Sequence, residues 1–227
     1  MTRAFADTRR LAERVRALLS SGDPVLRPLG EGRELARAFG ELEAATERSF
    51  WRVADRHVPS IARAMDHLNH RTRSRGLHER VVFSTRHAHE SPLLTSFDPG
   101  CRIGPVHLKM IVLDERYLVV PGPDGVAVSG SAYGSDDPDL VALGCAAFEE
   151  TWEAAVPWQE LGLRTPLPDR RFRVALLLLD GHSDREIADA LGVGARTVSH
   201  EVREVVAWLG ARNRSHAVAM LVAAGTR

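Results

Sequence analysis

Hydrophobic residues recur at helical spacing in several stretches of the first two thirds of the chain. Amphipathic helices are predicted over 4–20, ending at a Ser-Ser-Gly-Asp-Pro stretch, over 32–47, and after Pro59. Short apolar runs between and after them are typical of buried strands. These runs cover residues 50–53, 80–85, 107–113, 117–120 and 126–128, and a closing helix is expected over 140–155. Alternating helices and strands predict an α/β layer, a mixed sheet with flanking helices.

From Leu167 onward every apolar position follows helical spacing. Ser183 is placed to cap one of these helices, with Glu186 three residues later as in a capping box, and the helix should end at Gly192. The pattern predicts an all-α domain of four helices. We expect an N-terminal helix, an α/β domain, a proline-rich linker and this helical domain, with boundaries at 1–24, 25–157, 158–166 and 167–227.

Composition adds limits to this organisation. The chain has thirty basic and thirty acidic side chains, and residues 167–227 carry a net charge of only +2. Any contact with nucleic acid must therefore come from a local arrangement of residues. Two cysteines cannot form a disulfide framework, and a secretory signal and an apolar stretch long enough for a membrane are both missing. We expect a cytoplasmic protein with small buried thiols, no metal, no cofactor and no membrane partner.

The start of one C-terminal helix is polar on its outward side. A Gly-Val-Gly turn at 192–194 leads into this helix, and such a turn between two helices is the geometry that places the second in the major groove of DNA. With Val198 and Val202 facing inward, the polar residues share the outward face. They are Arg196, Thr197, Ser199, His200 and Arg203. On periodicity alone, a plain helical bundle with a solvated face explains the pattern equally well.

The residue types favour DNA binding, because the segment closely resembles the LuxR/GerE family of helix-turn-helix domains. The matching stretches are 167–171, 180–188, 191–193, 196–200 and 209–214. The resemblance implies double-stranded DNA as the partner, with base edges read by Ser199, His200 and Arg203. It implies phosphate contacts from Arg196, Thr197 and Arg214. It also implies a homodimer formed through the last helix, near 217–224.

Three residues depart from the family pattern. Pro168 and Arg171 stand where the family usually has Thr and Glu, so the first helix is expected to start differently. Glu201 stands where a non-acidic residue is common, and a carboxylate beside phosphates opposes binding. Replacing Glu201 by Gln is therefore predicted to tighten DNA binding.

The only lysine of the chain lies in an HxKxxxxD motif made by His107, Lys109 and Asp114. This motif resembles the first part of the phospholipase D signature. On the predicted strand, His107 and Lys109 would face the same side and could line a pocket for a phosphate-like or neutral polar ligand. The Gly-Ser-x-Asn context of active members is missing, and the motif occurs once. A buried strand that ends in a turn aspartate is the alternative interpretation.

The order of helices and strands also resembles the degenerate phospholipase D-like domain of TrmB-type regulators, which implies a ligand-sensing or dimerising module without hydrolysis. The first hypothesis is therefore a sequence-specific DNA-binding transcription regulator that is not an enzyme, with a small-molecule effector left open. One alternative is a phosphodiesterase or nuclease that pairs two HxKxxxxD motifs across a homodimer. Another is a partner-binding module whose helix-turn-helix has lost its affinity for DNA.

Overall fold

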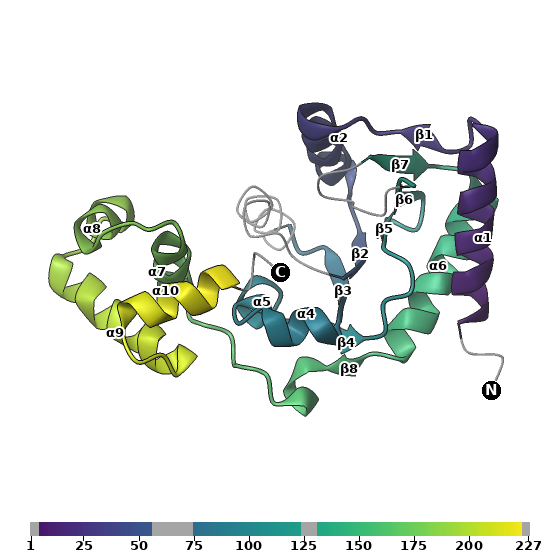
Figure 1. Ribbon diagram of the computed structural model, residues 1–227. Helices are drawn as coiled ribbons and strands as arrows, with labels where there is room; N and C mark the ends of the chain where they lie inside the picture. The colour runs from purple at the N-terminus through teal and green to yellow at the C-terminus, as the bar shows by residue number, and fades with distance from the viewer. Residues whose placement is uncertain (1–4, 56–74, 124–130, 224–227) are drawn as a thin grey trace. The chain divides into compact units, whose positions relative to one another are not determined.

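The chain forms two compact units in a computed structural model that describes residues 5–55, 75–123 and 131–223 (Figure 1). The sheet unit comprises residues 1–87 and 100–158, and the helix-turn-helix unit comprises residues 88–99 and 159–227. The helix expected after Pro59 and the strand expected over 126–128 lie outside the described residues. Each unit is described by itself.

The sheet unit is built on a mixed sheet in which eight strands are described, in the order β1-β7-β6-β5-β2-β3-β4-β8. Strands β2, β3 and β4 are parallel neighbours, and the remaining described pairs are antiparallel. The strands are β1 (Arg27–Pro28), β2 (Ser49–Ala54), β3 (His78–Ser84), β4 (Arg102–Gly104), β5 (Met110–Leu113), β6 (Tyr117–Pro121), β7 (Ala132–Ser135) and β8 (Val156–Pro157). The expectation of a mixed sheet with flanking helices is confirmed.

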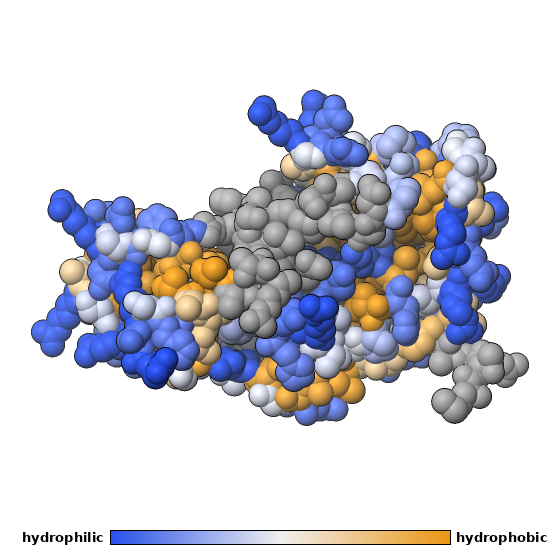
Figure 2. All heavy atoms as spheres, in the orientation of Figure 1, coloured by the Kyte–Doolittle hydropathy of each residue, from blue (hydrophilic) through white to orange (hydrophobic). Residues whose placement is uncertain are grey.

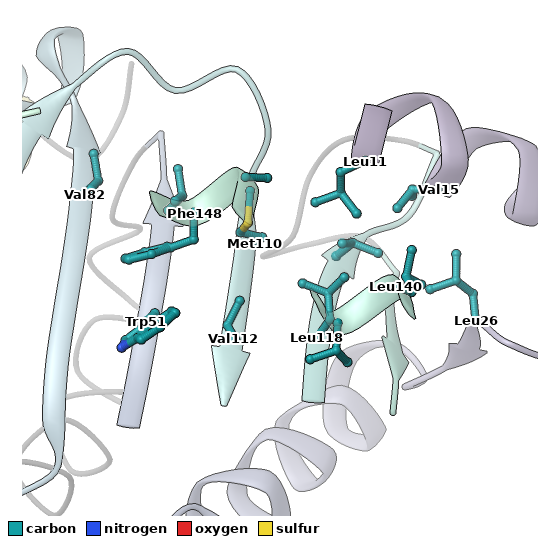
Figure 3. Packing of buried hydrophobic residues seen from close by; sticks show 14 of the residues in the cluster. Leu11, Val15, Leu26, Trp51, Val82, Met110, Val112, Leu118, Leu140 and Phe148 are labelled. Atoms are coloured by element: carbon teal, nitrogen blue, oxygen red, sulfur yellow. The ribbon is translucent and has the colours of Figure 1, made fainter. Parts of the chain in front are cut away.

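Two long helices cover one face of the sheet. Helix α1 (Ala6–Ser21) and helix α6 (Pro138–Glu153) run side by side in Figure 1. Their apolar stripes pack on inward-facing strand residues, and Figure 3 shows Leu11, Phe148 and Trp51 in this core. Phe148 is fully buried and its ring stacks on that of Trp51 at 5.0 Å between centroids. This packing, rather than helix propensity, stabilises the two helices.

The other face of β5, β6 and β7 is covered by α2 (Gly32–Ala45). Leu35 of this helix packs with Val119 of β6, whereas the neighbouring Leu118 and Val120 belong to the core under α1 and α6. Alternation along β6 thus distributes its side chains between two apolar layers. A strand that is buried on both faces has apolar residues at consecutive positions, as residues 117–120 do.

A carboxylate from α6 closes the first turn of α1. Glu150 accepts hydrogen bonds from the backbone N–H groups of Asp7 and Thr8 at 3.0 and 2.9 Å, and from the Thr8 hydroxyl at 3.0 Å. Burial opposes the charge of Glu150, but the backbone donors outweigh it and lower the pKa of this carboxyl. The helix therefore obtains its cap from a residue far along the chain.

Candidate nucleic-acid interface

Four helices of the helix-turn-helix unit appear where the apolar spacing predicts them. They are α7 (Asp169–Leu179), α8 (Asp184–Leu191), α9 (Ala195–Leu209) and α10 (Arg214–Ala223). Ser183 caps α8 in a complete capping box with Glu186, and α8 ends at Gly192 with φ of 64°. These local signals are confirmed. Ser183 also holds the pKa of the Glu186 carboxyl below its usual value, through a backbone and a side-chain hydrogen bond.

Helix α9 buries the face that the sequence assigns to the core. Val198, Val202, Val205 and Leu209 are all buried, and Ile187 of α8 is buried as well. The buried seam fixes the rotation of α9 about its own axis, so the opposite side must face solvent. Arg196, Ser199, His200 and Arg203 are exposed there, and Thr197 is half-buried. The predicted outward residues therefore share one polar surface, which we call the α9 face.

Hydrogen bonds hold parts of the α9 face in place. The Arg203 Nε–H donates to the backbone oxygen of Ser199 at 3.2 Å, one helical turn back. The Ser199 hydroxyl donates to a carboxylate oxygen of Asp184 on α8 at 3.3 Å. A hydroxyl and guanidinium groups on one exposed helix can donate to phosphates and to base edges.

Arg214, the expected phosphate contact outside α9, is engaged with α8. Its guanidinium pairs with the Asp184 carboxylate, and its second terminal nitrogen donates to the His182 backbone oxygen at 2.5 Å. Asp184 is thus shared between Ser199 of α9 and Arg214 of α10. The side chain of Arg214 keeps 38% of its surface exposed despite the ion pair.

Glu201 is not on the α9 face, and the expectation that it opposes phosphates is wrong. Its residue is only 4% exposed, and its carboxylate turns toward α7. One oxygen accepts from Arg170 and the other from Arg171, each at 2.9 Å. Burial disfavours the charge of Glu201, but these two guanidinium groups outweigh burial and lower the pKa of the carboxyl. The charge is neutralised by two arginines inside the domain.

The same contact involves the first helix of the unit. Arg171 pairs with Glu201 and also reaches Glu204 at 3.3 Å. Two residues that look unrelated in the sequence are therefore partners in one α7–α9 ion pair. Pro168 stands directly before α7 as its N-cap residue, in an extended conformation, and the helix begins at Asp169.

Residues 88–99 complete the core of this unit, although they precede it by some sixty positions in the chain. The segment holds the short helix α5 (Leu94–Phe97), and five of its residues from 93 to 97 are buried. Phe97 meets the ring of Phe172 edge-on at 4.9 Å. The sequence gives little signal for α5, because its four residues make about one helical turn and are too few to show a helical repeat of apolar positions.

The stretch expected as a linker is also tied to α9. The Trp208 indole N–H donates to the Thr165 backbone oxygen at 3.0 Å. Arg164 donates to the backbone oxygens of Trp208 and Leu209 at 3.2 and 3.1 Å, and its guanidinium lies over the Trp208 ring. The two bonds from Arg164 satisfy carbonyl groups that the end of α9 leaves unpaired.

Figure 2 shows hydrophobic residues gathered on the helix-turn-helix unit in the region of α7 and α10. On α10, Val222 is 40% exposed, and Val218 and Met220 are half-buried. The last helix thus presents apolar side chains on its surface, where the sequence resemblance implies a dimer contact.

The HxKxxxxD residues of the sheet unit do not form one cluster on a strand. Strand β5 begins at Met110, so His107 and Lys109 lie in the loop before it and the expected strand alternation does not apply to them. The exposed His107 meets the ring of Phe5 edge-on at 4.5 Å. The Lys109 ammonium lies 3.4 Å from the carboxylate of Asp55, which follows β2.

Asp114 lies at the other end of β5, and its carboxylate already has partners. It accepts the backbone N–H groups of Glu47, Arg48 and Ser49 at 2.7 to 2.8 Å. Burial raises the pKa of the Asp114 carboxyl, but these backbone bonds lower it by more. Five residues of extended chain at about 3.3 Å each would separate Asp114 from Lys109 by about 16 Å. Asp114 therefore stabilises the β5–β6 turn and the start of β2, and the expectation that it lines a ligand pocket with His107 and Lys109 stays a prediction.

Metal and thiol chemistry have little support in the described residues. That part of the chain contains no group of three or more His, Cys, Asp or Glu side chains placed to hold a metal ion. Cys101 is buried and Cys145 is half-buried, and neither of these two thiols forms a disulfide. Burial, with Glu115 and Glu149 nearby, raises the pKa of Cys145 to about 11.

Comparison with known proteins places a homeodomain-like domain at residues 165–210. TrmBL2, described as an archaeal chromatin protein, is similar at 15% identity and a TM-score of 0.45, over 66% of this chain and 62% of that one. Phosphatidylserine synthase of Haemophilus influenzae is similar at 16% identity and a TM-score of 0.45, over 60% of this chain and 41% of that one. VqmA of Vibrio cholerae, described as a LuxR-type receptor, is similar at 19% identity and a TM-score of 0.25, over 52% and 48%.

The chain thus spans less than two thirds of the length of each of these structures. No curated protein matches its sequence. Among the helices that the structure describes, none combines the length and apolar character needed to cross a lipid bilayer.

Proposed function

We propose that the protein is a sequence-specific DNA-binding transcription regulator of the LuxR type. The observation that carries this proposal is the α9 face, where polar and basic side chains stand outward over a fully buried seam. The homeodomain-like match covers both α8 and α9, the helix pair that such domains use. Arg196 and Thr197 hold phosphates at the start of α9, together with Arg214, while Ser199, His200 and Arg203 read base edges.

The proposal is tested by separating base reading from phosphate binding. A preferred duplex is first selected from a random library with the full chain, and affinity is then measured by fluorescence anisotropy on this duplex and on a scrambled one. Arg203→Ala should cost about 1–3 kcal/mol on the selected duplex and much less on the scrambled one. Arg196→Ala should weaken binding to both duplexes alike, since phosphates carry no sequence information.

Arg37→Ala is the matched control, because Arg37 is an exposed arginine of α2 in the sheet unit and pairs along its own helix with Glu41. Its affinity should equal that of the unchanged protein on both duplexes. Equal losses on both duplexes for Arg203→Ala would contradict a base-reading role. No selectable duplex at all would contradict sequence-specific binding.

We propose further that the protein acts as a homodimer through the apolar surface of α10, in the cytoplasm. A domain with a net charge of +2 gains useful affinity for DNA when two copies contact it together. The sheet unit serves as a phospholipase D-like sensing or dimerising module that does not hydrolyse phosphodiesters. The Asp114 carboxylate accepts three backbone donors at the far end of β5 from Lys109, which supports a role in the fold rather than in hydrolysis. Turnover of bis-nitrophenyl phosphate that disappears in His107→Ala would establish the enzyme alternative instead.

A further inference from the structure

Asp184 joins the last three helices of the helix-turn-helix unit. It is the first residue of α8, and its two carboxylate oxygens have different partners. One oxygen accepts from the Arg214 guanidinium of α10, and the other accepts the Ser199 hydroxyl of α9 at 3.3 Å. Both contacts lie within one compact unit of the chain. Asp184 therefore acts on the α9 face from a neighbouring helix.

Arg214 fixes the orientation of the Asp184 carboxylate. The other terminal nitrogen of Arg214 donates to the His182 backbone oxygen at 2.5 Å, so the guanidinium is bound to two groups at the start of α8. If Asp184 rotated away from Ser199, it would break its bond to the guanidinium, and hydrogen bonds between charged groups are stronger than those between neutral ones. The oxygen that faces Ser199 is thus held in place from its far side.

The Ser199 hydroxyl carries a single hydrogen, and Asp184 takes it. A hydroxyl donates one hydrogen bond and accepts through two lone pairs, whereas a carboxylate only accepts. The direction of the bond between these two groups is therefore set by their chemistry, with Ser199 as the donor. Ser199 is exposed on the α9 face. Toward a group outside the protein, its hydroxyl then offers only lone pairs.

The four bases of DNA differ in what they offer to such an acceptor. In the major groove, the amino groups of adenine and cytosine donate hydrogen bonds, whereas guanine and thymine present acceptors. A serine whose hydroxyl rotates freely suits either kind of base. We propose that Asp184 is a positioning residue that makes Ser199 select an amino base, adenine or cytosine, and reject guanine and thymine. This inference rests on the proposed DNA-binding function and adds the chemical class of one recognised base.

The test compares base preferences at one position of the DNA site. Duplexes are selected from a random library with the full chain, and the base pair whose preference disappears in Ser199→Ala is taken as the Ser199 position. Affinity is then measured by fluorescence anisotropy on four duplexes that differ only there. The unchanged protein should bind the duplexes with adenine or cytosine about threefold to tenfold more tightly than those with guanine or thymine.

Asp184→Ala releases the hydroxyl proton of Ser199, so this variant should bind all four duplexes with affinities within about twofold of one another. The preference at the base read by Arg203 should persist, because the Nε–H of Arg203 donates to the Ser199 backbone oxygen and not to Asp184. A merely structural role for Asp184 would weaken both preferences together. Release of Arg214 changes affinity equally for every sequence, since it concerns phosphates.

Asp189→Ala is the matched control, because Asp189 is an exposed aspartate of the same helix and its removal changes the net charge by the same amount. It should leave the preference at the Ser199 position intact. A preference for guanine or thymine in the unchanged protein would overturn the inference, as would an unchanged preference in Asp184→Ala. Both results leave DNA binding itself standing, whereas a chain that selects no duplex overturns the proposed function as well.

A second variant covers the case in which Asp184→Ala does not fold, as judged by circular dichroism. Asp184→Asn then replaces it, because the amide group can donate to the Ser199 oxygen and turn the hydroxyl proton toward DNA. This variant should lose the preference for adenine or cytosine, and retention of that preference would overturn the inference.

Discussion

Replacing Glu201 by Gln tests whether the carboxylate acts within the domain or toward a bound nucleic acid. Gln keeps the size of the side chain and one acceptor oxygen but removes the charge. The carboxylate is buried and receives hydrogen bonds from Arg170 and Arg171. The substitution therefore leaves two guanidinium groups facing a neutral amide.

The exposure of the two arginines sets the size of the effect. Breaking a fully buried ion pair costs about 3–5 kcal/mol because the remaining charge is stranded. Here the Arg170 side chain is 60% exposed and regains water, whereas that of Arg171 is 24% exposed and loses more. We therefore expect Glu201→Gln to lower the free energy of opening of α7 and α9 by about 2 kcal/mol, between a surface pair and a fully buried pair.

The sign of the pH dependence follows from the lowered pKa of Glu201. A carboxyl whose pKa is lower in the folded state contributes stability above its unfolded pKa of about 4.3, and this contribution is lost as pH falls through the folded value. The difference in stability between the unchanged protein and Glu201→Gln should thus be constant near neutral pH. It should shrink as the solution is acidified below about pH 4.

Native-state hydrogen exchange of α7 and α9 measures the change directly, and 2 kcal/mol corresponds to about thirtyfold faster exchange. Glu41→Gln is the matched control, because its pair with Arg37 is exposed and should cost at most about 0.5 kcal/mol. An exchange rate of α7 that is unchanged within threefold, together with tighter DNA binding, would contradict the internal role of Glu201 and would put its carboxylate beside a phosphate.

Three further outcomes follow from single side chains. Ser183→Ala should destabilise α8 by about 1 kcal/mol, because it removes the cap of the helix, and urea unfolding of the full chain followed by exchange in α8 would show it. Asp114→Ala should destabilise the sheet unit by about 1–2 kcal/mol, since it removes three hydrogen bonds, two of which are exposed to water. Asp114→Asn should lose part of this stability and should no longer show the loss that occurs as pH falls through the lowered pKa, as acid titration followed by circular dichroism would detect. Cys145, with a pKa of about 11, should react with a thiol-specific reagent at pH 7.5 far more slowly than a free cysteine, and equal rates would contradict its burial.

Local signals in the sequence predicted the helical part of the fold well. The spacing of Val198, Val202 and Val205 fixed both the extent of α9 and its buried side, and Ser183 with Glu186 fixed the start of α8. Such signals depend on residues within one or two helical turns. They need no knowledge of the rest of the chain.

The features that the sequence did not reveal all depend on distant partners. The charge of Glu201 alone does not predict its position, because that position is set by Arg171 on another helix. Strand β5 begins three residues after His107, since apolar content does not mark where pairing with β2 starts. The docking of Phe97 on Phe172 joins residues 75 positions apart. Nothing in the immediate neighbourhood of any of these residues signals the contact.

The cap that Glu150 provides to α1 has a consequence for how the chain folds during synthesis. The first helix emerges early, but its first-turn donors find their carboxylate 142 or 143 residues later. At a synthesis rate of roughly 5–20 residues per second, α6 is made on the order of ten seconds after α1. Strand β1 waits similarly for β7. During that time the apolar side of α1 is not yet covered by α6. A chaperone that binds amphipathic helices during synthesis should therefore improve the yield of folded protein more than one that acts after the chain has left the ribosome.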